Sequence, residues 1–420
     1  MTKRALILVE GHSGIGLLYV KAARRLGLHP ITLSANPTQY DYLMAEGIEA
    51  IRVDTDNLDA LIHECARVRA TFDISGITGF SGADESACVM ASELCRRFDL
   101  PGPNPASIER CCNKFTQRQL LAKAGVPVPA YRLARNATDV ERAAEEIGLP
   151  VVLKPVVGSG SSGVQLCRNA DELAEHTAYL LGGDHIWRSS PSLLVEEFAQ
   201  GPQYGAEIMG NEVVGIAPAD FGPHPHFVFH GVSFPAPLAD VEQKRIVDVS
   251  LSCLRVLDLG WGPSNVEIRW TKRGPVVIEV NPRLPGTPTP QLVQLAYGID
   301  LVTEHIKLVI GQEWDLRRRH SHPAAARFLI PDGDGILDLI NSNRAAAIPG
   351  IVEVKFYVEP KTPIHRKGDY RDAIGHIIAV SPSFAQTETI LQDAVDLVDW
   401  SITPFSTPSE WQPSSYLAGH

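Results

Sequence analysis

The sequence predicts an α/β protein in which an N-terminal doubly wound parallel sheet precedes a strand-rich α+β region. Two observations carry this prediction. Strand and helix patterns alternate over the first hundred residues, and strand patterns dominate residues 192–282, where one long helical pattern interrupts them at 242–260. At 420 residues the chain is too long for one average core, so we expect more than one domain.

The N-terminal alternation begins with an apolar run at residues 5–10 that ends at glycines and predicts a first strand. A β-α-β-α order is typical of a parallel sheet with helices on both faces. The proline-rich segment 101–107 marks the end of this first domain, residues 1–107. The other elements predicted here are helices at 17–27, 58–68 and 83–100 and strands at 29–34, 50–54 and 75–80.

The rest of the chain is predicted to begin with a helix at 111–125 and a short strand near residue 131. Beyond residue 311 the pattern is weaker, and three apolar runs predict strands of a small accessory sheet at 323–330, 351–359 and 376–382. Between these parts, we predict helices at 138–148, 170–181 and 242–260 and strands at 150–155, 164–167, 193–198, 204–209, 212–218, 264–270 and 275–281.

Composition excludes several classes of protein. A formal net charge of −11 argues against a protein whose main ligand is nucleic acid, which requires a dominant basic surface. No uncharged apolar run approaches 18 residues, so we expect no transmembrane helix. The seven cysteines are odd in number and form no C-x-x-C motif, which favours a reducing, cytoplasmic location over a disulfide framework or a zinc ribbon.

The segment GSGSSG at 158–163 matches the G-x-G-x-x-G pattern of dinucleotide-binding proteins. In that fold a helix follows the glycines directly and helps to hold the pyrophosphate, but here an alternating strand pattern follows at 164–167. We therefore predict the tip of a β-hairpin, a flap whose backbone N–H groups cover phosphates. Lys154, at the end of the preceding strand, offers its ammonium group to the same phosphates.

A second glycine cluster, GHSGIG at 11–16, lies between a predicted strand and a predicted helix. Its spacing differs from the dinucleotide order, and no acidic residue follows at the end of the next strand. A tight strand-to-helix turn is the favoured interpretation. Such a turn also lies at the carboxyl edge of the sheet, where it would line a substrate pocket.

Two predicted strands carry a set of polar residues at period-two spacing. Glu267 lies on one strand, and Glu279, Asn281 and Arg283 follow one another on the next and its extension. Two carboxylates and an amide oxygen are hard donors that suit Mg²⁺ bridging nucleotide phosphates. Arg283 would add a fork-shaped cation suited to a phosphate or a carboxylate. The alternative is a half-exposed strand with ordinary surface salt bridges.

Three weaker signals accompany this set. The strand LLVEEF at 193–198 has a backbone able to read an adenine edge, and Lys114 offers a cation at a helix start. The run HPHFVFH contains His224, His226 and His230, which could supply imidazoles to zinc. Because no further cysteine or aspartate anchor is evident nearby, a substrate-facing His230 is favoured over a zinc site.

Taken in order, Lys114, Lys154-Pro155, the flap 158–163, Glu196-Glu197-Phe198, Glu267 and Glu279-x-Asn281-x-Arg283 resemble the motifs of the ATP-grasp superfamily over about residues 1–310. The resemblance implies a pre-ATP-grasp domain at 1–107, an ATP-grasp domain at 108–310 with a lid at about 128–198, and an α+β portion at 311–420 that completes it. The nucleotide-binding residues implied in this way are Lys114, Lys154, Gly158, Ser159, Gly160, Ser161, Ser162, Gly163, Glu196, Glu197, Phe198 and Gln203.

Further roles follow from the same resemblance. Glu267, Glu279 and Asn281 would hold Mg²⁺, or Mn²⁺ in its place, while Lys154 and Arg283 would act on the reacting groups. The family usually has a glutamate for the ribose hydroxyls where this chain has Gln203, with Glu207 four residues later. This departure leaves open which of the two side chains contacts ribose.

Within the superfamily, the chain is similar to the L-amino-acid ligases, dipeptide synthases that occur in peptide-antibiotic biosynthesis. The supporting segments are the helix that begins with Asp84-Glu85, FHGVSFPAPL at 229–238 and NPRLPGT at 281–287. The amino-acid pocket implied by this similarity includes Glu85, His230, Arg283 and Gly286.

The implied reaction joins two L-amino acids into a dipeptide through an acyl phosphate, with ATP converted to ADP and phosphate. The substrates would be amino acids, which are small molecules, with no nucleic acid or membrane partner, and the family implies a cytoplasmic homodimer. The alternative is another ATP-grasp ligase that activates bicarbonate, formate or a different carboxylate, of the biotin-carboxylase or purine-biosynthetic kind. No A-M-K-M biotin-carrier motif occurs in the sequence.

Overall fold

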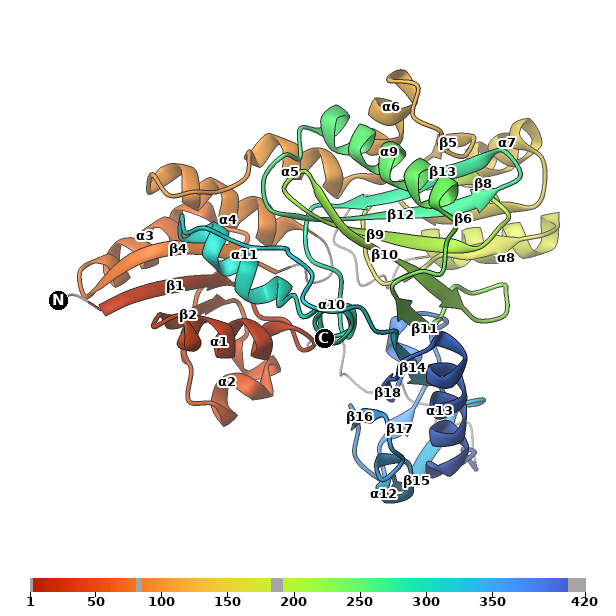
Figure 1. The fold of residues 1–420 in the computed structure, drawn as a ribbon. Helices are drawn as coiled ribbons and strands as arrows, with labels where there is room; N and C mark the ends of the chain where they lie inside the picture. Colours follow the sequence, from red (N-terminus) through yellow and green to blue (C-terminus); the bar gives the residue numbers. More distant parts are fainter. Residues whose placement is uncertain (1–2, 81–84, 183–191, 407–420) are drawn as a thin grey trace.

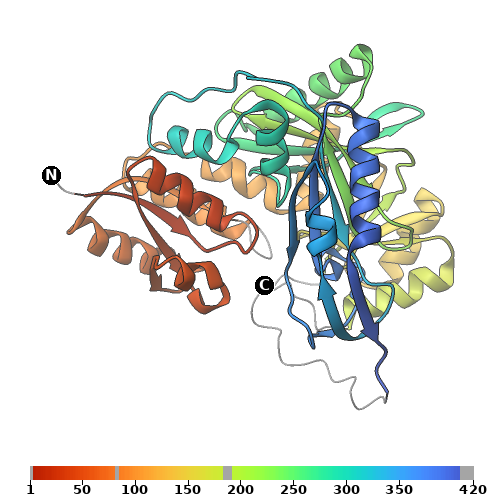
Figure 2. The same cartoon turned by 60° about the horizontal axis from the view of Figure 1, so that its bottom comes forward.

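The computed structural model describes residues 3–80, 85–182 and 192–406 (Figure 1). The strands of these residues form four sheets. Figures 1 and 2 both place the N-terminal sheet on one side of the molecule and the C-terminal strands on another, with the largest sheet joining the parts. A parallel N-terminal sheet followed by antiparallel sheets confirms the predicted fold class.

The N-terminal sheet has four parallel strands in the order β3-β2-β1-β4. Strand β1 (Lys3–Val9) is buried on both sides, because Leu6 and Leu8 pack with helix α1 whereas Ile7 and Val9 pack with α3 and α4. Burial on both faces explains the continuous apolar run and confirms the doubly wound arrangement. The other elements here are α1 Gly16–Arg25, β2 His29–Ser34, η1 Pro37–Gln39, α2 Asp41–Ala45, β3 Glu49–Arg52, α3 Leu58–Arg69, β4 Phe72–Gly79 and α4 Ser86–Arg97.

The predicted helix at 111–125 is wrong in its extent, because the chain forms two helices here, α5 (Pro105–Cys112) and α6 (Lys114–Lys123). Asn104 caps α5 with Pro105 in its first turn, so part of the proline-rich segment is helical. Asn113 separates the two helices and caps α6 by accepting a hydrogen bond from the Thr116 N–H at 3.0 Å. The break fixes Lys114 as the first residue of α6.

The second sheet is antiparallel with the order β5-β8-β6-β7 and is covered by helices α7 and α8. Strand β6 (Val151–Pro155) pairs with β7 (Gln165–Cys167) as a hairpin, in the register Val151–Cys167. The glycine-rich segment is therefore a hairpin tip, as predicted, and no helix opens directly after it. The remaining elements are β5 Tyr131–Ala134, α7 Ala137–Ile147, α8 Ala170–Leu181 and β8 Leu193–Glu197.

The largest sheet has eight strands in the order β13-β12-β9-β10-β11-β14-β18-β16. Strands at 323–330, 351–359 and 376–382 form as predicted, but their assignment to an accessory sheet is wrong, because they extend this sheet beyond β11. Its elements are β9 Gln203–Met209, β10 Glu212–Phe221, β11 Phe229–Phe234, α9 Asp240–Leu257, β12 Pro263–Thr271, β13 Gly274–Asn281, β14 Ala324–Leu329, β16 Ile351–Phe356 and β18 Gly375–Val380.

A small antiparallel sheet in the C-terminal part is built instead from β17, β15 and β19. Helix α13 covers the C-terminal strands, and helix α11 returns to the N-terminal sheet, where it packs beside α1 and β4. The elements of this part are α10 Thr289–Tyr297, α11 Leu301–Val309, β15 Gly335–Asn341, α12 Asn343–Ala346, β17 Pro363–Ile364, η2 Tyr370–Asp372, α13 Phe384–Leu397 and β19 Asp399–Thr403.

The two faces of the strands β9, β12 and β13 have different roles. Val266, Ile268 and Val280 pack with helices α5, α6 and α9 in one apolar cluster. Glu267 and Asn281 alternate with these residues and therefore lie on the opposite face. The helices thus leave one face of the sheet for polar chemistry. In the described part of the chain, no helix is long and apolar enough to cross a membrane.

Candidate active site

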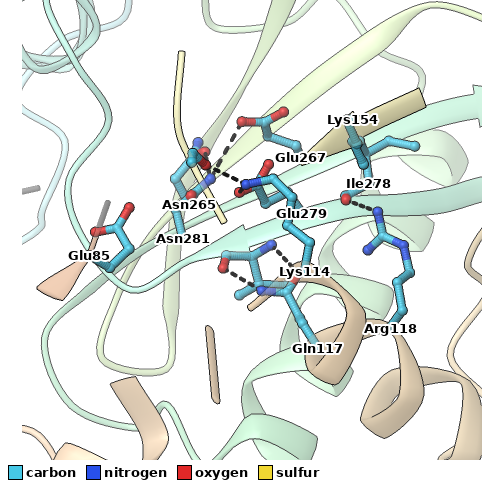
Figure 3. A network of polar contacts seen from close by, with 12 residues as sticks. Glu85, Lys114, Gln117, Arg118, Lys154, Asn265, Glu267, Ile278, Glu279 and Asn281 are labelled. Carbon is cyan, nitrogen blue, oxygen red and sulfur yellow. Dashed lines mark hydrogen bonds and ion pairs between the residues drawn. The ribbon is translucent and has the colours of Figure 1, made fainter. Parts of the chain in front are cut away.

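The polar face of β12 and β13 brings the predicted carboxylates together (Figure 3). Glu267 and Glu279 are cross-strand partners, and Asn265 is paired in the same way with Asn281. The Asn281 Nδ2 lies 3.4 Å from Glu267 Oε1, and Gln203 donates to Glu267 Oε2 at 3.1 Å. Two carboxylates and an amide therefore converge at one point, which is a donor set suited to Mg²⁺.

A β-bulge accompanies this convergence. The partner of Glu267 is Glu279, but the partner of the next residue, Ile268, is Val277, so Ile278 is the extra residue on β13. Such a bulge re-aims the side chains beside it. Here it keeps Glu279 on the polar face while Val277 and Val280 both pack into the apolar cluster.

Helix α6 fixes the position of β13, which is an edge strand. The Gln117 side chain bonds both polar groups of the Val280 backbone, at 2.8 Å to its oxygen and 2.9 Å to its nitrogen. Arg118 donates to the carbonyl oxygen of Ile278, the bulged residue (Figure 3). These bonds satisfy backbone groups that an edge strand would otherwise leave unpaired, and they hold Glu279 in place.

Two lysines lie beside the carboxylates. The Lys114 Nζ is 2.9 Å from Glu279 Oε1 and also donates to the carbonyl oxygen of Gly158 in the flap. The Lys154 Nζ is 2.5 Å from Glu196 Oε2. Burial lowers the pKa of Lys154, and the neighbouring Glu196 only partly offsets this. Lys114 thus joins the flap to a metal-type donor, and Lys154, on the strand that leads into the flap, is paired with Glu196.

The sequence predicts that the backbone of Glu196 contacts adenine, but its side chain also forms ion pairs that were not predicted. Its carboxylate lies between Lys154 and Arg118, whose Nε is 2.5 Å from Glu196 Oε1, and all three side chains are buried. Burial opposes ionisation of Glu196, but the two cations outweigh it and lower its pKa. Arg118 could not be recognised from the sequence, because its partner Glu196 is 78 residues away.

We expect Glu196→Gln to lower the free energy of unfolding by about 3 kcal/mol or more, because it leaves Lys154 and Arg118 buried without their shared counter-ion. Urea unfolding followed by circular dichroism measures this change. The exposed Glu146, paired with Arg132 on the surface, provides the matched variant Glu146→Gln, whose effect should stay below about 1 kcal/mol. Equal losses in the two variants would contradict the buried-charge interpretation.

The two metal-type carboxylates are held in different protonation states. Burial, followed by the charge of Glu279, raises the pKa of Glu267 to about 7. Burial acts on Glu279 as well, but Lys114 and Lys154 outweigh it and lower the pKa of Glu279. Lys114 therefore supplies positive charge to Glu279, and Glu267 ionises less readily than Glu279.

The flap between β6 and β7 has a backbone suited to a mobile, close-fitting lid. Gly158, Gly160, Gly163 and also Ser161 have positive φ angles of 135°, 64°, 69° and 63°. The flap is docked on the C-terminal part of the chain, because Ser162 Oγ donates to Asp369 Oδ2 at 2.7 Å. The N–H of Tyr370 donates to the Gly160 carbonyl at 3.2 Å. Sequence reasoning missed this contact.

The residues predicted to hold adenine and ribose lie beside this face. Strand β8 is internal to its sheet, and the Glu197 N–H donates to the Ala130 carbonyl at 2.8 Å, whereas Phe198 follows the last residue of the strand. The Phe198 ring lies 5.2 Å from the His224 ring and 5.8 Å from the Arg269 guanidinium carbon. An aromatic and cationic surface therefore borders the strand end at which adenine is predicted to bind.

Gln203 and Glu207 differ in their surroundings. Gln203 is bonded to Glu267 at the polar face, whereas Glu207 accepts from Asn265 Nδ2 at 2.9 Å and is buried. Burial raises the pKa of Glu207 to about 8, and Arg283 acts in the opposite direction. Glu207 therefore faces the Asn265 and Arg283 side of the site, and Gln203 remains the better candidate for a ribose contact.

Glu207 and Glu267 together predict how the stability of the metal-free protein depends on pH. Both folded-state pKa values exceed the value of about 4.3 expected in the unfolded chain, so the folded state binds more protons and its stability falls as pH rises through 7 and 8. The carboxylates and histidines with depressed pKa values, such as His12 and His305, do not oppose this above about pH 7, where most unfolded histidines have lost their protons.

We therefore expect a lower Tm at pH 8.5 than at pH 7 in the absence of divalent cations. Glu207→Gln keeps the hydrogen bond to Asn265 but removes one of the two titrating groups, so this variant should show a smaller drop. Thermal unfolding of both proteins at the two pH values measures the difference. The same drop in parent and variant would show that Glu207 does not titrate in this range.

Arg283, two residues after Asn281, forms an ion pair with Glu85. Arg283 Nε lies 2.9 Å from Glu85 Oε1, and Glu85 precedes the first residue of α4. Burial disfavours the charged guanidinium, but Glu85 outweighs it and raises the pKa of Arg283. A guanidinium and a carboxylate side by side match the two charged groups of a free amino acid. Asp84 lies outside the described residues.

The remaining predicted residues are placed as follows. A side chain on Gly286 would meet no atom within 4 Å, so this position is open. His230 lies on β11 beside Gly222, three strands away from β12, and is not among the residues that line the cavity under Arg283. Among the described residues, no three His, Cys, Asp or Glu side chains could hold a metal together, so the structure offers no support for zinc at 224–230.

Comparisons with known proteins agree with this geometry. Residues 111–287 match the family described as ATP-grasp domain, and residues 327–403 match the family described as L-amino acid ligase C-terminal domain 2. The fold is similar to that of the L-amino acid ligase from Bacillus licheniformis, with a TM-score of 0.80 at 18% identity over 96% of this chain and 100% of that structure.

Two relatives are also similar in sequence. The uncharacterized protein y4rH of Sinorhizobium fredii is 60% identical over 405 residues, which is 96% of this chain and 84% of the relative. Mouse carnosine synthase 1 is 28% identical over 365 residues, and the match covers 80% of this chain but only 42% of that protein. The chain thus spans less than half of the carnosine synthase it resembles.

Proposed function

The chain belongs to the ATP-grasp family of carboxylate–amine ligases, and we propose that it joins two L-amino acids into a dipeptide through an acyl phosphate. One observation carries this proposal: the metal-type carboxylates Glu267 and Glu279 and the Arg283–Glu85 pair lie on one connected polar surface. The first group suits a nucleotide phosphate and the second suits an amino acid. The C-terminal match to L-amino acid ligases favours an amino-acid substrate over bicarbonate or formate.

The residues present fit a divalent cation and a nucleotide. Glu267, Glu279 and Asn281 are hard oxygen donors brought within one cluster, where burial, followed by the charge of Glu279, raises the pKa of Glu267. When bound, Mg²⁺ or Mn²⁺ would neutralise charge on the transferring phosphoryl group. Lys114, released from Glu279, would be free to pair with phosphate oxygens.

The protein's own side chains would then order the two substrates. Arg283 orients the carboxylate of the first amino acid toward the γ-phosphate, and Lys154 stabilises the charge that spreads over the transferring group. Attack by this carboxylate releases ADP and forms the acyl phosphate. The flap covers the acyl phosphate and excludes water that would hydrolyse it. The amine of the second amino acid attacks the acyl carbon, phosphate leaves, and the amine gives up its proton to solvent.

A screen of amino-acid pairs tests the proposal. Phosphate release is measured with ATP and Mg²⁺ for each pair, and products are identified by mass spectrometry. We expect phosphate release that requires both amino acids, together with the mass of a dipeptide. Phosphate release with one amino acid alone and no dipeptide would instead point to a different nucleophile.

The docked flap gives a second prediction. A methyl group on Gly160 would lie 2.2 Å from the Tyr370 ring at a φ of 64°, so Gly160→Ala should prevent the flap from closing against the C-terminal segment. We expect kcat/KM for ATP to fall by about tenfold or more, which corresponds to about 1.4 kcal/mol, with a small change in Tm. Steady-state kinetics and thermal unfolding measure the two effects.

Gly148 provides a matched control for this variant. It also has a positive φ, of 89°, but a methyl group there meets no atom within 4 Å and the residue lies at the end of α7. Gly148→Ala should therefore carry only the backbone strain and leave the kinetics for ATP nearly unchanged. Equal losses of kcat/KM in both variants would mean that docking on Tyr370 is not what the flap needs.

A further inference from the structure

A cavity of about 50 Å³ lies under Arg283, between the carboxyl edge of the N-terminal sheet and the start of β12. Arg283 and His12 both line this cavity, and His12 belongs to the glycine-rich turn at 11–16. A cavity that holds one buried water has a volume of roughly 10–15 Å³. The cavity under Arg283 therefore has room for about three to five waters, a volume comparable to that of a small side chain. The roles assigned above to Glu85 and Arg283 do not use this space.

Five rings form one continuous wall of this cavity. His12 meets Phe80 at a centroid distance of 6.3 Å, and Phe80 meets Tyr19 edge-to-face at 4.8 Å. Tyr19 in turn contacts His305 at 5.8 Å, and His305 contacts Trp261 at 6.4 Å. The rings come from the segments that follow β1 and β4, from α1 and α11, and from the segment before β12, so the wall exists only once these distant parts have folded together. We call this space the aromatic cavity.

The aromatic cavity is uncharged apart from Arg283. Among the described residues that line it there is no Asp, Glu or Lys. Burial, followed by the charge of Arg283, lowers the pKa of His12 to about 4, and burial lowers the pKa of His305 to about 4 as well. Both imidazoles are therefore neutral at pH 7, and the Tyr19 hydroxyl is bonded to His305 Nδ1 at 2.6 Å. Beyond Arg283, which is paired with Glu85, a charged side chain entering the cavity would find no counter-ion.

His12 is held in a defined tautomer. Its Nδ1 accepts hydrogen bonds from the backbone N–H groups of Gly14 at 3.0 Å and Ile15 at 3.2 Å. A neutral ring with Nδ1 as acceptor carries its proton on Nε2, so His12 presents one N–H donor beside Arg283. The cavity thus offers an aromatic wall, and His12 adds a neutral N–H donor near Arg283.

We propose that the aromatic cavity binds the side chain of the amino acid whose carboxylate is activated, and that it selects uncharged, small to medium-sized apolar side chains. This inference rests on the proposed ligase function, because Arg283 then holds the reacting carboxylate at the mouth of the cavity. The side chain on the same α-carbon extends from that point into the space between the rings. His12 contributes a neutral donor near the carboxyl group and adds no charge to the cavity.

The test compares amino acids as carboxyl donors. Phosphate release is measured with ATP, Mg²⁺ and one fixed amine partner, and the N-terminal residue of each dipeptide, read by fragmentation mass spectrometry, identifies the donor. We expect kcat/KM for alanine, valine or leucine to exceed that for aspartate or lysine by about 100-fold or more, because a buried unpaired charge is strongly disfavoured. Comparable values for charged and apolar donors would overturn the proposal.

Two variants with opposite effects show whether the cavity itself is responsible. Phe80→Leu enlarges it and should raise the kcat/KM ratio of phenylalanine to alanine by about tenfold, whereas Ala91→Val fills it and should lower the ratio of leucine to glycine by about tenfold. Ala394→Val makes the same change in a buried helical alanine of the C-terminal core and should leave both ratios unchanged.

The outcomes separate the inference from the proposed function. Dipeptide formation with ratios that stay within about twofold in both Phe80→Leu and Ala91→Val would overturn the aromatic cavity as the side-chain site while leaving the ligase intact. An absence of phosphate release with every amino-acid pair in the parent protein would instead overturn the ligase function. Folding of each variant is checked by thermal unfolding, and either variant alone is sufficient for the comparison.

Discussion

Glu279→Gln is expected to reduce ATP-dependent phosphate release by about 1,000-fold or more while the protein stays folded. Removing a single preorganised electrostatic contact at a reacting centre typically costs about 100- to 1,000-fold, and loss of a metal ligand removes several such contacts at once. Glu279 is the carboxylate that Lys114 and Lys154 keep ionised, so it is the donor best prepared to receive a cation. Glutamine keeps its shape and removes its charge.

Phosphate release measured over a range of Mg²⁺ concentrations tests this expectation, and the Tm reports on folding. Glu146→Gln, on the exposed surface of α7, is the control and should behave as the parent protein. If Glu279→Gln keeps activity within about tenfold of the parent at every Mg²⁺ concentration, the oxygen cluster on β12 and β13 is not the metal site.

Arg283→Lys has the second largest expected effect. Lysine keeps the positive charge but loses the planar fork that can hold a carboxylate through two parallel hydrogen bonds. We expect kcat/KM for the carboxyl-donating amino acid to fall by about 100- to 1,000-fold, with little change in the KM for ATP. The split arises because Arg283 lies at the Glu85 end of the site, whereas Lys114 and Lys154 lie at the flap.

Kinetics with ATP and the amino acid varied separately measure this split. Arg142→Lys, in an exposed pair with Asp139 on α7, is the matched control because it makes the same change in a surface pair. If the KM for ATP rises by the same factor by which kcat/KM for the amino acid falls, Arg283 contacts the nucleotide phosphates and not the amino acid. The role of Arg283 in the proposed mechanism would then be wrong.

Much of the fold and of the candidate site could be predicted from local patterns. Glu267, Glu279 and Asn281 were found because alternate residues of a strand share a face, and the same rule separates them from Val266 and Val280, which pack under the helices. The flap was distinguished from a dinucleotide loop because the residues after it alternate as a strand. These features depend on a few neighbouring residues, which is why they are visible in one sequence.

Features that depend on distant contacts could not be predicted in this way. Three strands after residue 311 are predicted from local patterns, but β14 joins the large sheet by pairing with β11, whose residues are about 100 positions away, and β18 and β16 then follow β14. The hydrogen bond between Ser162 and Asp369 joins residues that are 207 positions apart in the sequence. Glu196, the shared counter-ion of Arg118 and Lys154, lies 78 positions from Arg118. The proline-rich segment 101–107 predicts a domain boundary, but helix α5 begins within it, at Pro105 with Asn104 as its cap.

His12 illustrates both what local sequence patterns predict and what depends on distant contacts. Its position in a strand-to-helix turn at the carboxyl edge of the sheet was predicted, and so was a possible substrate pocket there. Its neutral state, its tautomer and its neighbours Phe80 and Arg283 follow only from the folded arrangement. The sequence therefore predicts the location of this histidine in the fold, and the packing of distant elements determines its protonation state, its tautomer and its neighbours.

The transfer of an oxygen atom tests the central claim most directly. If a carboxylate is activated as an acyl phosphate, an amino acid labelled with ¹⁸O in its carboxyl group must pass one labelled oxygen to the phosphate when the dipeptide forms. Mass spectrometry of the released phosphate should therefore show one ¹⁸O per phosphate, with ADP as the other nucleotide product. Unlabelled phosphate, or AMP and pyrophosphate as products, would contradict activation of a carboxylate by the γ-phosphate in this site.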